Sequence, residues 1–569
     1  MIKTLLYKHY IISIVILGYF VLFIPFLGQV HLFDWDEINF AEASREMIVT
    51  GDWLNVQINY EPFWEKPPLF IWFQAISMSF FGINEFAARL PNVLIGLFTI
   101  LLLYQTVRLR YGLKASILTV LFYLGSFTPH FYFKSGIIDP LFNLFIFSSV
   151  LFLVRAIENK TSWAFFISGL MLGFAVITKG PAAILLVGLT GLCYQWVYRI
   201  NFYTFKEILI LVFGLVVIPG IFFSIQVSQN GWWFLKEFII YQIELFKYPI
   251  ASHGQPFYYH VVVLLFGCFP LFVLVLKALF TPIRTRMDST YVRFMKVLFW
   301  VVLIVFSLVT TKIVHYSSMC YIPLSIIAGI WFSNHRHIHK SIKIILIVVG
   351  FCWFIIFSVL GILSIYPSLL TSVFINELIV DTSVTSMLRN SISWSYVPLL
   401  VSIVFIISIW LLLLRYKSPR IMLFLILNSL CVSIFMTTTI PNIEHLVQGD
   451  WIRQLETYQN KPMVHFTYGF KSYAHRYYTQ QNKLEQVVEV RQKMLNDQGI
   501  KSLYDFNQHE KKIFDNQVRD AVILNTEIPF SITARISKFE ELEANYPNLI
   551  KVFEGNGYGV WERAKEFDK

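Results

Sequence analysis

Long apolar stretches separated by short polar breaks dominate residues 1–440, whereas residues 441–569 mix apolar and polar positions as a water-soluble domain does. About 20 consecutive apolar residues can cross a membrane as a helix. Thirteen stretches approach that length, namely 9–28, 86–107, 115–132, 138–154, 162–178, 181–198, 207–226, 257–279, 294–309, 317–333, 342–365, 395–414 and 421–439. We therefore predict an α-helical polytopic membrane protein with about 13 transmembrane helices over 1–440 and a small soluble α/β domain over 441–569.

Basic residues in the loops predict the orientation of these helices. If the N-terminus, with Lys3 and Lys8, lies in the cytoplasm, every inner loop carries at least two lysines or arginines, and the outer loops together carry far fewer than the inner loops together. This is the distribution found in membrane proteins, whose cytoplasmic loops are enriched in basic residues. An odd number of spans then places residues 441–569 on the outer side, which is periplasmic for a protein of the bacterial inner membrane.

The first outer loop, residues 29–85, is too long to be a simple connection. Asp34 can cap a helix from about 35 to 50, with Glu37 reaching back as its capping-box partner. We expect this helix to lie along the membrane surface. Residues 68–82 are apolar but short, which favours a second interfacial or re-entrant helix over a span.

Short patterns in residues 441–569 predict alternating helices and strands. The expected helices are 442–457, 471–479 and 537–545, and the expected strands are 462–467, 519–525 and 549–554. A small α/β domain on the outer face would contain both kinds of element.

Composition narrows the class of protein. Only 14% of the residues are charged, compared with about a quarter in soluble domains. The net charge of +11 is distributed over short loops and forms no continuous basic face, which argues against nucleic-acid binding. All five cysteines lie in or beside apolar stretches, and no CxxC occurs, which argues against a disulfide framework in the C-terminal domain.

Ionisable and polar residues gather at the predicted outer ends of the spans. They are Asp36, Glu37, Glu65, Lys66, Asp139, Lys179, His253, Lys312, His315 and Tyr316. Ionisable groups near hydrocarbon are costly and usually mark a functional site. Carboxylates together with cations suit a reaction in which one group takes a proton while others hold an anionic leaving group.

Structural roles are the alternative for each residue taken alone. Glu37 and His253 could serve only as a helix cap and a loop residue, and Asp139-Pro140 could simply begin a helix. Snorkelling to the interface would explain the basic residues at helix ends, which are Arg89, Lys134 and Lys179.

A series of motifs resembles one family of membrane enzymes. Residues 36–53 read DE-x-x-x-AE-x-SREM-x-x-x-GDW, and EKPP follows at 65–68. Asp139-Pro140, TKGP at 178–181 and the Lys312-x-x-x-Tyr316 spacing complete the series. Over residues 1–330 the chain resembles the aminoarabinose transferase and protein O-mannosyltransferase superfamily, which are GT-C glycosyltransferases with lipid-linked sugar donors.

The resemblance implies a role for each matching residue. Asp36 would be the principal catalytic carboxylate, with Glu65 and Asp139 as further catalytic-site carboxylates. Residues that would bind the donor phosphate or line the substrate cavity are Lys66, Lys179, Lys312, Tyr316 and Glu37. A divalent metal of unknown identity is an open alternative, with Glu65 and His253 as ligands and His475 as a less favoured third ligand.

The implied function is the transfer of a sugar from a polyprenyl-phosphate donor to a lipid A, glycan or protein acceptor on the outer face, with inversion. Asn39-Phe40 stands where the aminoarabinose branch often has Arg-Tyr, so the identity of the sugar stays open. The alternative is a transporter of lipids or sugar-lipids without bond chemistry. It would need a polar path to the cytoplasmic side, and the spans contain few charges at mid-membrane.

Overall fold

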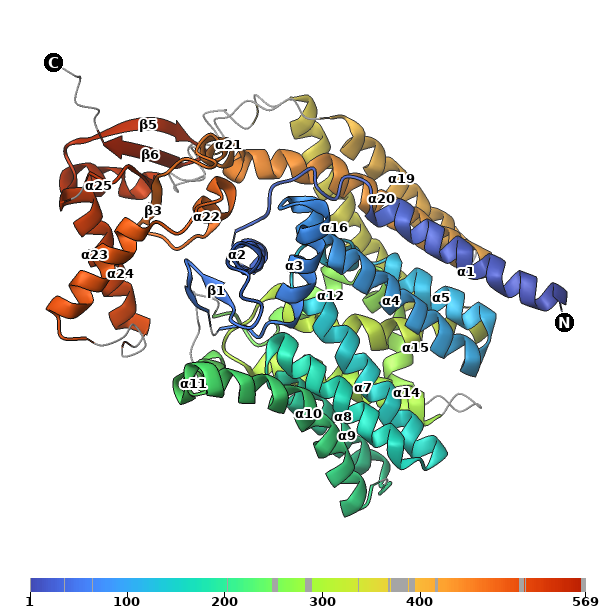
Figure 1. The fold of residues 1–569 in the computed structure, drawn as a ribbon. Coiled ribbons are helices and arrows are strands. Elements are labelled where there is room, and N and C mark those ends of the chain that lie inside the picture. The colour runs from blue at the N-terminus through green and yellow to red at the C-terminus, as the bar shows by residue number, and fades with distance from the viewer. Residues whose placement is uncertain are drawn as a thin grey trace.

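The computed structural model describes residues 2–563 except 35, 64, 202, 248–253, 282–288, 336, most of 367–394, 415–417, most of 501–507 and 526. Most of the chain is helical (Figure 1). The helices before residue 445 are α1 (Ile2–Phe23), α2 (Asp36–Thr50), α3 (Leu69–Phe81), α4 (Glu85–Tyr111), α5 (Leu113–Leu124), α6 (Phe127–Phe133), α7 (Asp139–Asn159), α8 (Ser162–Lys179), α9 (Ala182–Tyr198), α10 (Phe205–Asn230), α11 (Trp232–Lys247), α12 (Tyr259–Gly267), α13 (Leu271–Phe280), α14 (Thr290–Leu308), the 3₁₀ helix η2 (Val314–Cys320), α15 (Tyr321–Asn334), α16 (Lys340–Ile365), α19 (Val397–Leu414) and α20 (Ser418–Glu444).

Each of the 13 predicted stretches is helical over most of its length. Among the described residues, nine helices are long and apolar enough to cross a membrane, and α12 with α13 form a further pair bent by 119°. The three remaining predicted stretches coincide with shorter apolar helices, which are Tyr10–Phe23, Leu113–Leu124 and Ala182–Tyr198. The chain is therefore a polytopic α-helical membrane protein, and its count of 13 crossings is supported roughly.

Residues after 445 form a mixed sheet with helices around it. The sheet order is β3-β4-β6-β5, with β3 (Val464–Tyr468) parallel to β4 (Phe530–Arg535) and the other pairs antiparallel, including β5 (Leu549–Gly555) with β6 (Tyr558–Arg563). The helical elements are the π-helical turn η4 (His445–Gly449), α21 (Asp450–Glu456), α22 (Ala474–Thr479), α23 (Glu485–Asp497), α24 (Gln508–Asn525), the short η6 (Ile536–Lys538) and α25 (Phe539–Asn545). The helical patterns at 442–457, 471–479 and 537–545 agree with these elements, whereas the division at residue 440 stays a prediction, because α20 continues across it.

One predicted strand is wrong. Residues 519–525 belong to α24, where Phe514, Val518 and Val522 are buried at a spacing of four residues. That spacing places all three on one face of a helix, so the apolar residues near position 522 belong to a helical stripe rather than a strand. The strands β4 and β6 were not predicted.

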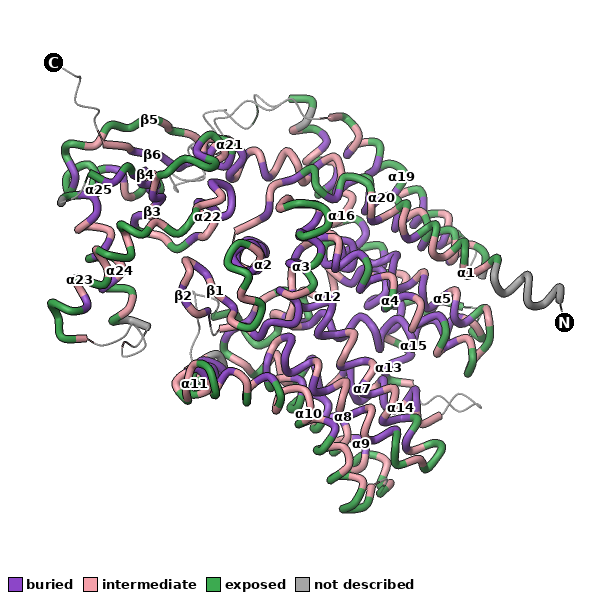
Figure 2. Tube along the Cα trace, viewed as in Figure 1, coloured by how far each residue is buried: buried purple, intermediate pink, exposed green. Residues whose placement is uncertain are grey.

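Helix α2 is buried within the protein, and its expected position along the membrane surface stays a prediction. All its residues from Glu37 to Met47 except Asn39 are buried, and Figure 2 shows these purple residues together with the green, exposed end of the helix. It contacts α3 on one side and α22 on the other. The Arg45 guanidinium donates to the Gln481 carbonyl at 3.0 Å. Residues 29–85 and the C-terminal sheet region therefore lie on the same side of the membrane.

A two-residue hairpin extends from this loop toward the C-terminal region. It joins β1 (Gln57–Ile58) to β2 (Glu61–Pro62) through Asn59 and Tyr60, which both have positive φ, as a type I′ turn requires. The carboxylate of Glu46 in α2 accepts from the backbone N–H groups of Asn59 and Tyr60, each at 2.7 Å. The hairpin is thereby fixed to α2.

His31 links the start of this loop to the C-terminal helices. Its Nδ1 lies 2.9 Å from Glu444 Oε1, and its Nε2 lies 3.7 Å from Glu456 Oε1. Burial disfavours the charged ring, but the two carboxylates outweigh burial and raise the pKa of His31 to about 9. Since the ordinary pKa is 6.5, protonation stabilises the fold fully below pH 6.5, and this contribution is lost as the pH rises through about 9.

We expect a His31→Asn variant to be less stable than wild type by on the order of 1–3 kcal/mol at pH 6. The difference should shrink as the pH is raised to 10, because wild-type His31 is then neutral as well. Thermal unfolding in detergent across this pH range measures it, and Glu444→Gln should reproduce the same profile. A difference that stays constant from pH 6 to 10 would contradict a charged His31.

Candidate active site

The candidate site is built around an ion pair between the ends of two neighbouring helices. Asp139 is the first residue of α7, followed by Pro140, and Lys179 is the last residue of α8. A carboxylate is favoured at a helix N-terminus and a cation at a C-terminus. Because α7 and α8 run in opposite directions, these ends meet, and Lys179 Nζ lies 2.5 Å from Asp139 Oδ1.

His315 connects this pair to Asp36. The ring lies in η2, and its Nε2 is 3.7 Å from Asp36 Oδ2 and 3.8 Å from Asp139 Oδ2. The Asp36 side chain is 34% exposed, whereas that of Asp139 is 2% exposed. Tyr316 follows, with its ring centroid 4.8 Å from Lys179 Nζ. Four segments distant in sequence thus bring two carboxylates, a cation, an imidazole and a phenol together.

Glu65 and Lys66 lie beside this cluster, next to Tyr241 of α11. The Tyr241 hydroxyl is 3.4 Å from Glu65 Oε2, and Lys66 Nζ lies 5.4 Å from the Tyr241 ring centroid. Burial, followed by the negative charges of Glu65 and Asp36, raises the pKa of Tyr241. Lys66 is also near enough to Asp139 and Tyr316 for its charge to act on both. The EKPP motif therefore faces the same region as Asp36.

Glu37 is held by structural contacts, and its assignment to substrate binding stays a prediction. Its two carboxylate oxygens accept from the Arg89 guanidinium at 2.8 and 3.0 Å. They also accept from the backbone N–H groups of Phe33 and Gly136 at 2.9 and 2.7 Å. Glu37 is therefore a buried structural residue, and the bond to Phe33 corresponds to the predicted reach back across the helix start.

Two of the basic residues at helix ends, Arg89 and Lys179, are held by ion pairs within the protein, which snorkelling to the interface does not explain. Arg89 is 4% exposed and is held by Glu37, and Lys179 is held by Asp139. Lys134 Nζ, in contrast, lies 3.3 Å from the Pro25 carbonyl in an exposed contact away from the cluster. Lys312 is 6% exposed and donates to the Val309 carbonyl at 2.7 Å, so its role toward a donor stays a prediction.

The metal site expected at Glu65, His253 and His475 stays a prediction. In the described part of the chain, no three His, Cys, Asp or Glu side chains lie close enough to hold a metal ion. Glu65 is engaged by Tyr241 and by Lys471, whose Nζ lies 3.5 Å from Glu65 Oε1. His253 lies outside the described residues, and His475 lies in the C-terminal region.

Sequence reasoning missed the parts played by His315, Tyr241 and Arg89. His315 stood among the polar residues at the outer ends of the spans, but no pattern assigned it a role between two carboxylates. Its position one residue before Tyr316, in a polar break, was the available signal. Tyr241 gave no signal, because it lies in an amphipathic stretch rich in aromatic residues.

Known proteins are similar to parts of this chain in sequence. Residues 65–223 match the family model described as dolichyl-phosphate-mannose-protein mannosyltransferase. An undecaprenyl phosphate-alpha-4-amino-4-deoxy-L-arabinose arabinosyl transferase from Pectobacterium carotovorum is 28% identical over 57% of this chain and 59% of its own length. An uncharacterized protein from Aquifex aeolicus is 28% identical over 54% of this chain and 71% of its own length. The chain thus spans somewhat over half the length of most curated relatives it matches.

One solved structure matches almost the whole chain. The crystal structure of ArnT from Cupriavidus metallidurans bound to undecaprenyl phosphate has a TM-score of 0.74 and covers 98% of both chains at 17% identity. The same protein in the apo state gives a TM-score of 0.71. At this identity the match shows the fold alone. Together with the family match over residues 65–223, it agrees with the resemblance seen in the motifs, and the chain has the fold of this ArnT structure.

Proposed function

We propose that this protein is a glycosyltransferase that moves one sugar from a polyprenyl-phosphate carrier to an acceptor oxygen on the outer face of the membrane. The observation that carries the proposal is the meeting of Asp36, Asp139, Lys179 and His315 in one cluster, with Lys66 beside it. A reaction that releases a phosphate needs cations near the leaving group and a base near the acceptor. The cluster supplies both.

Asp36 is the group that fits the role of base. It is the most exposed carboxylate in the cluster, so an acceptor can reach it from the aqueous side. The Asp36 carboxylate takes the proton of the acceptor O–H as the acceptor oxygen bonds to the anomeric carbon. The bond between that carbon and the phosphate oxygen breaks, and the electron pair leaves with the polyprenyl phosphate. Attack opposite the phosphate inverts the anomeric centre.

The cations fit the role of holding the phosphate. Lys66 and Lys179 carry positive charge to the region of Tyr316, whose hydroxyl can donate a hydrogen bond. Asp139 holds the Lys179 ammonium in place through the ion pair at 2.5 Å, so we assign Asp139 a positioning role. As phosphate leaves, it gains negative charge, and fixed cations stabilise the transition state more than the ground state.

The test is transfer from a purified donor. Full-length protein in nanodiscs is given a polyprenyl phosphate carrying a labelled sugar, together with candidate acceptors of the lipid A, glycan and protein classes. Release of polyprenyl phosphate together with labelled acceptor supports the proposal. Movement of intact sugar-lipid between leaflets without release of polyprenyl phosphate would instead indicate a transporter.

Lys66→Ala should weaken the binding of polyprenyl phosphate about 10- to 100-fold, because a charge-assisted contact to phosphate is worth about 1.5–3 kcal/mol. The matched control is Lys134→Ala, since among the described contacts that half-buried ammonium donates only to the Pro25 carbonyl. The affinity of the Lys134→Ala variant for polyprenyl phosphate should stay within about twofold of wild type. Binding to the detergent-solubilised protein is measured by thermophoresis. Equal losses in the two variants would argue against a phosphate contact for Lys66.

The C-terminal region and the cluster are proposed to lie on the periplasmic side of a bacterial inner membrane. The loop charges support this orientation. The contact between Arg45 and Gln481 supports a shared side for the first long loop and the C-terminal region. A reporter that is active only in the periplasm should be active when fused after Lys569. Activity of a reporter that works only in the cytoplasm would reverse the topology.

A further inference from the structure

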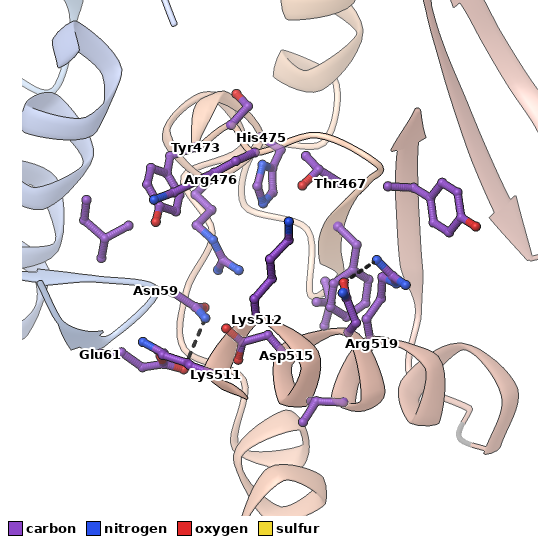
Figure 3. Close-up of a pocket in the computed structure, with 18 of the residues that line it drawn as sticks. Asn59, Glu61, Thr467, Tyr473, His475, Arg476, Lys511, Lys512, Asp515 and Arg519 are labelled. Carbon is purple, nitrogen blue, oxygen red and sulfur yellow. Dashed lines mark hydrogen bonds and ion pairs between the residues drawn. The ribbon is translucent and has the colours of Figure 1, made fainter. Parts of the chain in front are cut away.

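A cavity lies between the β1–β2 hairpin and the C-terminal region, and the roles proposed for Asp36, Lys66 and Lys179 do not involve it. Its volume is about 780 Å³, within the range of small-molecule sites. Its walls come from the hairpin, from β3 and the segment after it, and from α24, as the close-up shows (Figure 3). A cavity of this size can hold a ligand of roughly two sugar rings.

Most charged groups in its walls neutralise one another. Glu61 is paired with Arg491 and with Lys511, whose Nζ lies 2.6 Å from Glu61 Oε2. Glu65 faces Lys471 at 3.5 Å. Arg519 donates to Asp520 at 2.9 and 3.0 Å. These groups therefore have little charge left for a ligand.

Two cations in the walls remain without such a partner. Within the described ranges, neither the Arg476 guanidinium nor the Lys512 ammonium has an assigned hydrogen bond or ion pair. The carboxylates that attract Arg476 are Glu46 and Glu42 of α2. Glu46 already accepts from the hairpin turn, and Glu42 already accepts from Arg45 at 2.7 Å twice. Figure 3 shows the Lys512 and Arg476 side chains directed toward the middle of the cavity.

A buried imidazole adds a third polar group. His475 lines the cavity and is 4% exposed, and its Nδ1 has no hydrogen-bond partner among the described residues. Burial of a polar atom without a partner is unfavourable, so such atoms usually meet a ligand or water. Tyr473, Phe466 and Phe470 supply flat apolar surface in the same walls. Cations, an unsatisfied imidazole and aromatic faces together suit a hydroxyl-rich ligand that carries negative charge.

We propose that this cavity binds the acceptor as an acidic saccharide, with its phosphate or carboxylate between Arg476 and Lys512. The inference rests on the proposed function, because Glu65 belongs both to the cavity wall and to the region beside Asp36. A saccharide held here has one end next to the EKPP segment. The cavity therefore acts as the part of the acceptor site that selects for charge, separate from the donor-phosphate cations Lys66 and Lys179.

The test measures saccharide binding to the full-length protein in detergent by calorimetry. The probes are a disaccharide phosphate, a disaccharide of similar size carrying a carboxylate, the neutral disaccharide and inorganic phosphate. We expect at least one acidic disaccharide to bind tenfold or more tightly than both the neutral disaccharide and inorganic phosphate. Tighter binding of the phosphate or of the carboxylate form identifies the charged group. The proposal would be overturned if the neutral disaccharide, or inorganic phosphate, bound as tightly as the acidic disaccharides.

Lys512→Ala provides the residue-level test, because Lys512 is exposed and its removal should leave the fold intact. Acidic-disaccharide affinity should fall about tenfold or more, whereas Lys493→Ala, which removes an exposed lysine of α23 outside these walls, should leave it unchanged. Unchanged affinity in Lys512→Ala would overturn the assignment. The Asp36→Asn variant should bind the saccharide like wild type. Sugar transfer without saccharide binding would reject this cavity alone, and binding without any transfer would reject the proposed enzymatic function.

Discussion

An Asp36→Asn variant should lose sugar transfer by about 10²–10⁴ in rate, because loss of a positioned general base typically has that effect. The asparagine keeps the size of the side chain and cannot take the acceptor proton. The fold should survive, since α2 is held by the Glu37–Arg89 pair and by Arg45 rather than by Asp36. The single-turnover rate, measured with saturating labelled donor, isolates this step from donor binding.

Asp34→Asn is the matched control for that measurement. Asp34 lies two residues earlier, near enough to Tyr558 of the C-terminal sheet for its charge to act on that tyrosine. Its replacement should leave the transfer rate within a few fold of wild type. The free energy of unfolding of both variants should differ from that of wild type by no more than the effect of one helix-terminal charge, about 0.3–1 kcal/mol. Thermal unfolding measures this difference. A well-folded Asp36→Asn protein with the full transfer rate would refute the assignment of Asp36 as the base.

Arg89→Met should have the largest effect on stability, about 3–5 kcal/mol, since breaking a buried ion pair leaves an uncompensated charge. The guanidinium donates to both oxygens of Glu37 and to the carbonyls of Leu27, Val30 and His31 at 3.1, 2.6 and 3.0 Å. Methionine fills similar volume but supplies none of these donors. Loss of folded protein is measured by chemical unfolding in detergent micelles.

Arg110→Met tests the same chemistry at the opposite end of α4. Arg110 pairs with Glu158 at 2.6 Å, but the two side chains are 29% and 24% exposed. A solvated pair of this kind contributes about 0–1 kcal/mol. The double variant Glu37→Gln with Arg89→Met should be less destabilised than the sum of its single changes, because the buried negative charge is removed as well. Similar losses in Arg89→Met and Arg110→Met would contradict the structural role of Arg89.

Helix positions in the membrane region could be predicted because the signal is local. A run of apolar residues such as 342–365 has few other stable conformations in a membrane, where each backbone group needs an internal partner. The family motif at residues 36–53 could be recognised because it is long and its residues follow a specific spacing. Both inferences depend only on residues close together in the sequence.

Contacts between distant segments could not be predicted in the same way. The burial of α2 depends on the docking of α22, more than 400 residues later, and its own sequence shows only a mixed polar and apolar pattern. The pairing of Glu37 with Arg89 spans 52 residues, and the meeting of His315 with Asp36 joins η2 to α2. Residues 519–525 were predicted as a strand because a short apolar run does not distinguish a strand from one face of a helix.

The burial of α2 beneath the C-terminal region also sets an order of events during synthesis. Besides Arg45, the Leu32 N–H donates to the Tyr478 hydroxyl at 2.6 Å, and the Gln448 amide donates to the Leu32 carbonyl at 2.9 Å. Asp36 leaves the ribosome early, whereas these partners are translated only after the last apolar helix, α20. The segment that carries Asp36 is therefore covered by the C-terminal region only after the preceding helices have been synthesised. A chain that ends before residue 445 would lack these partners, so the polar residues around Asp36 would stay exposed to water.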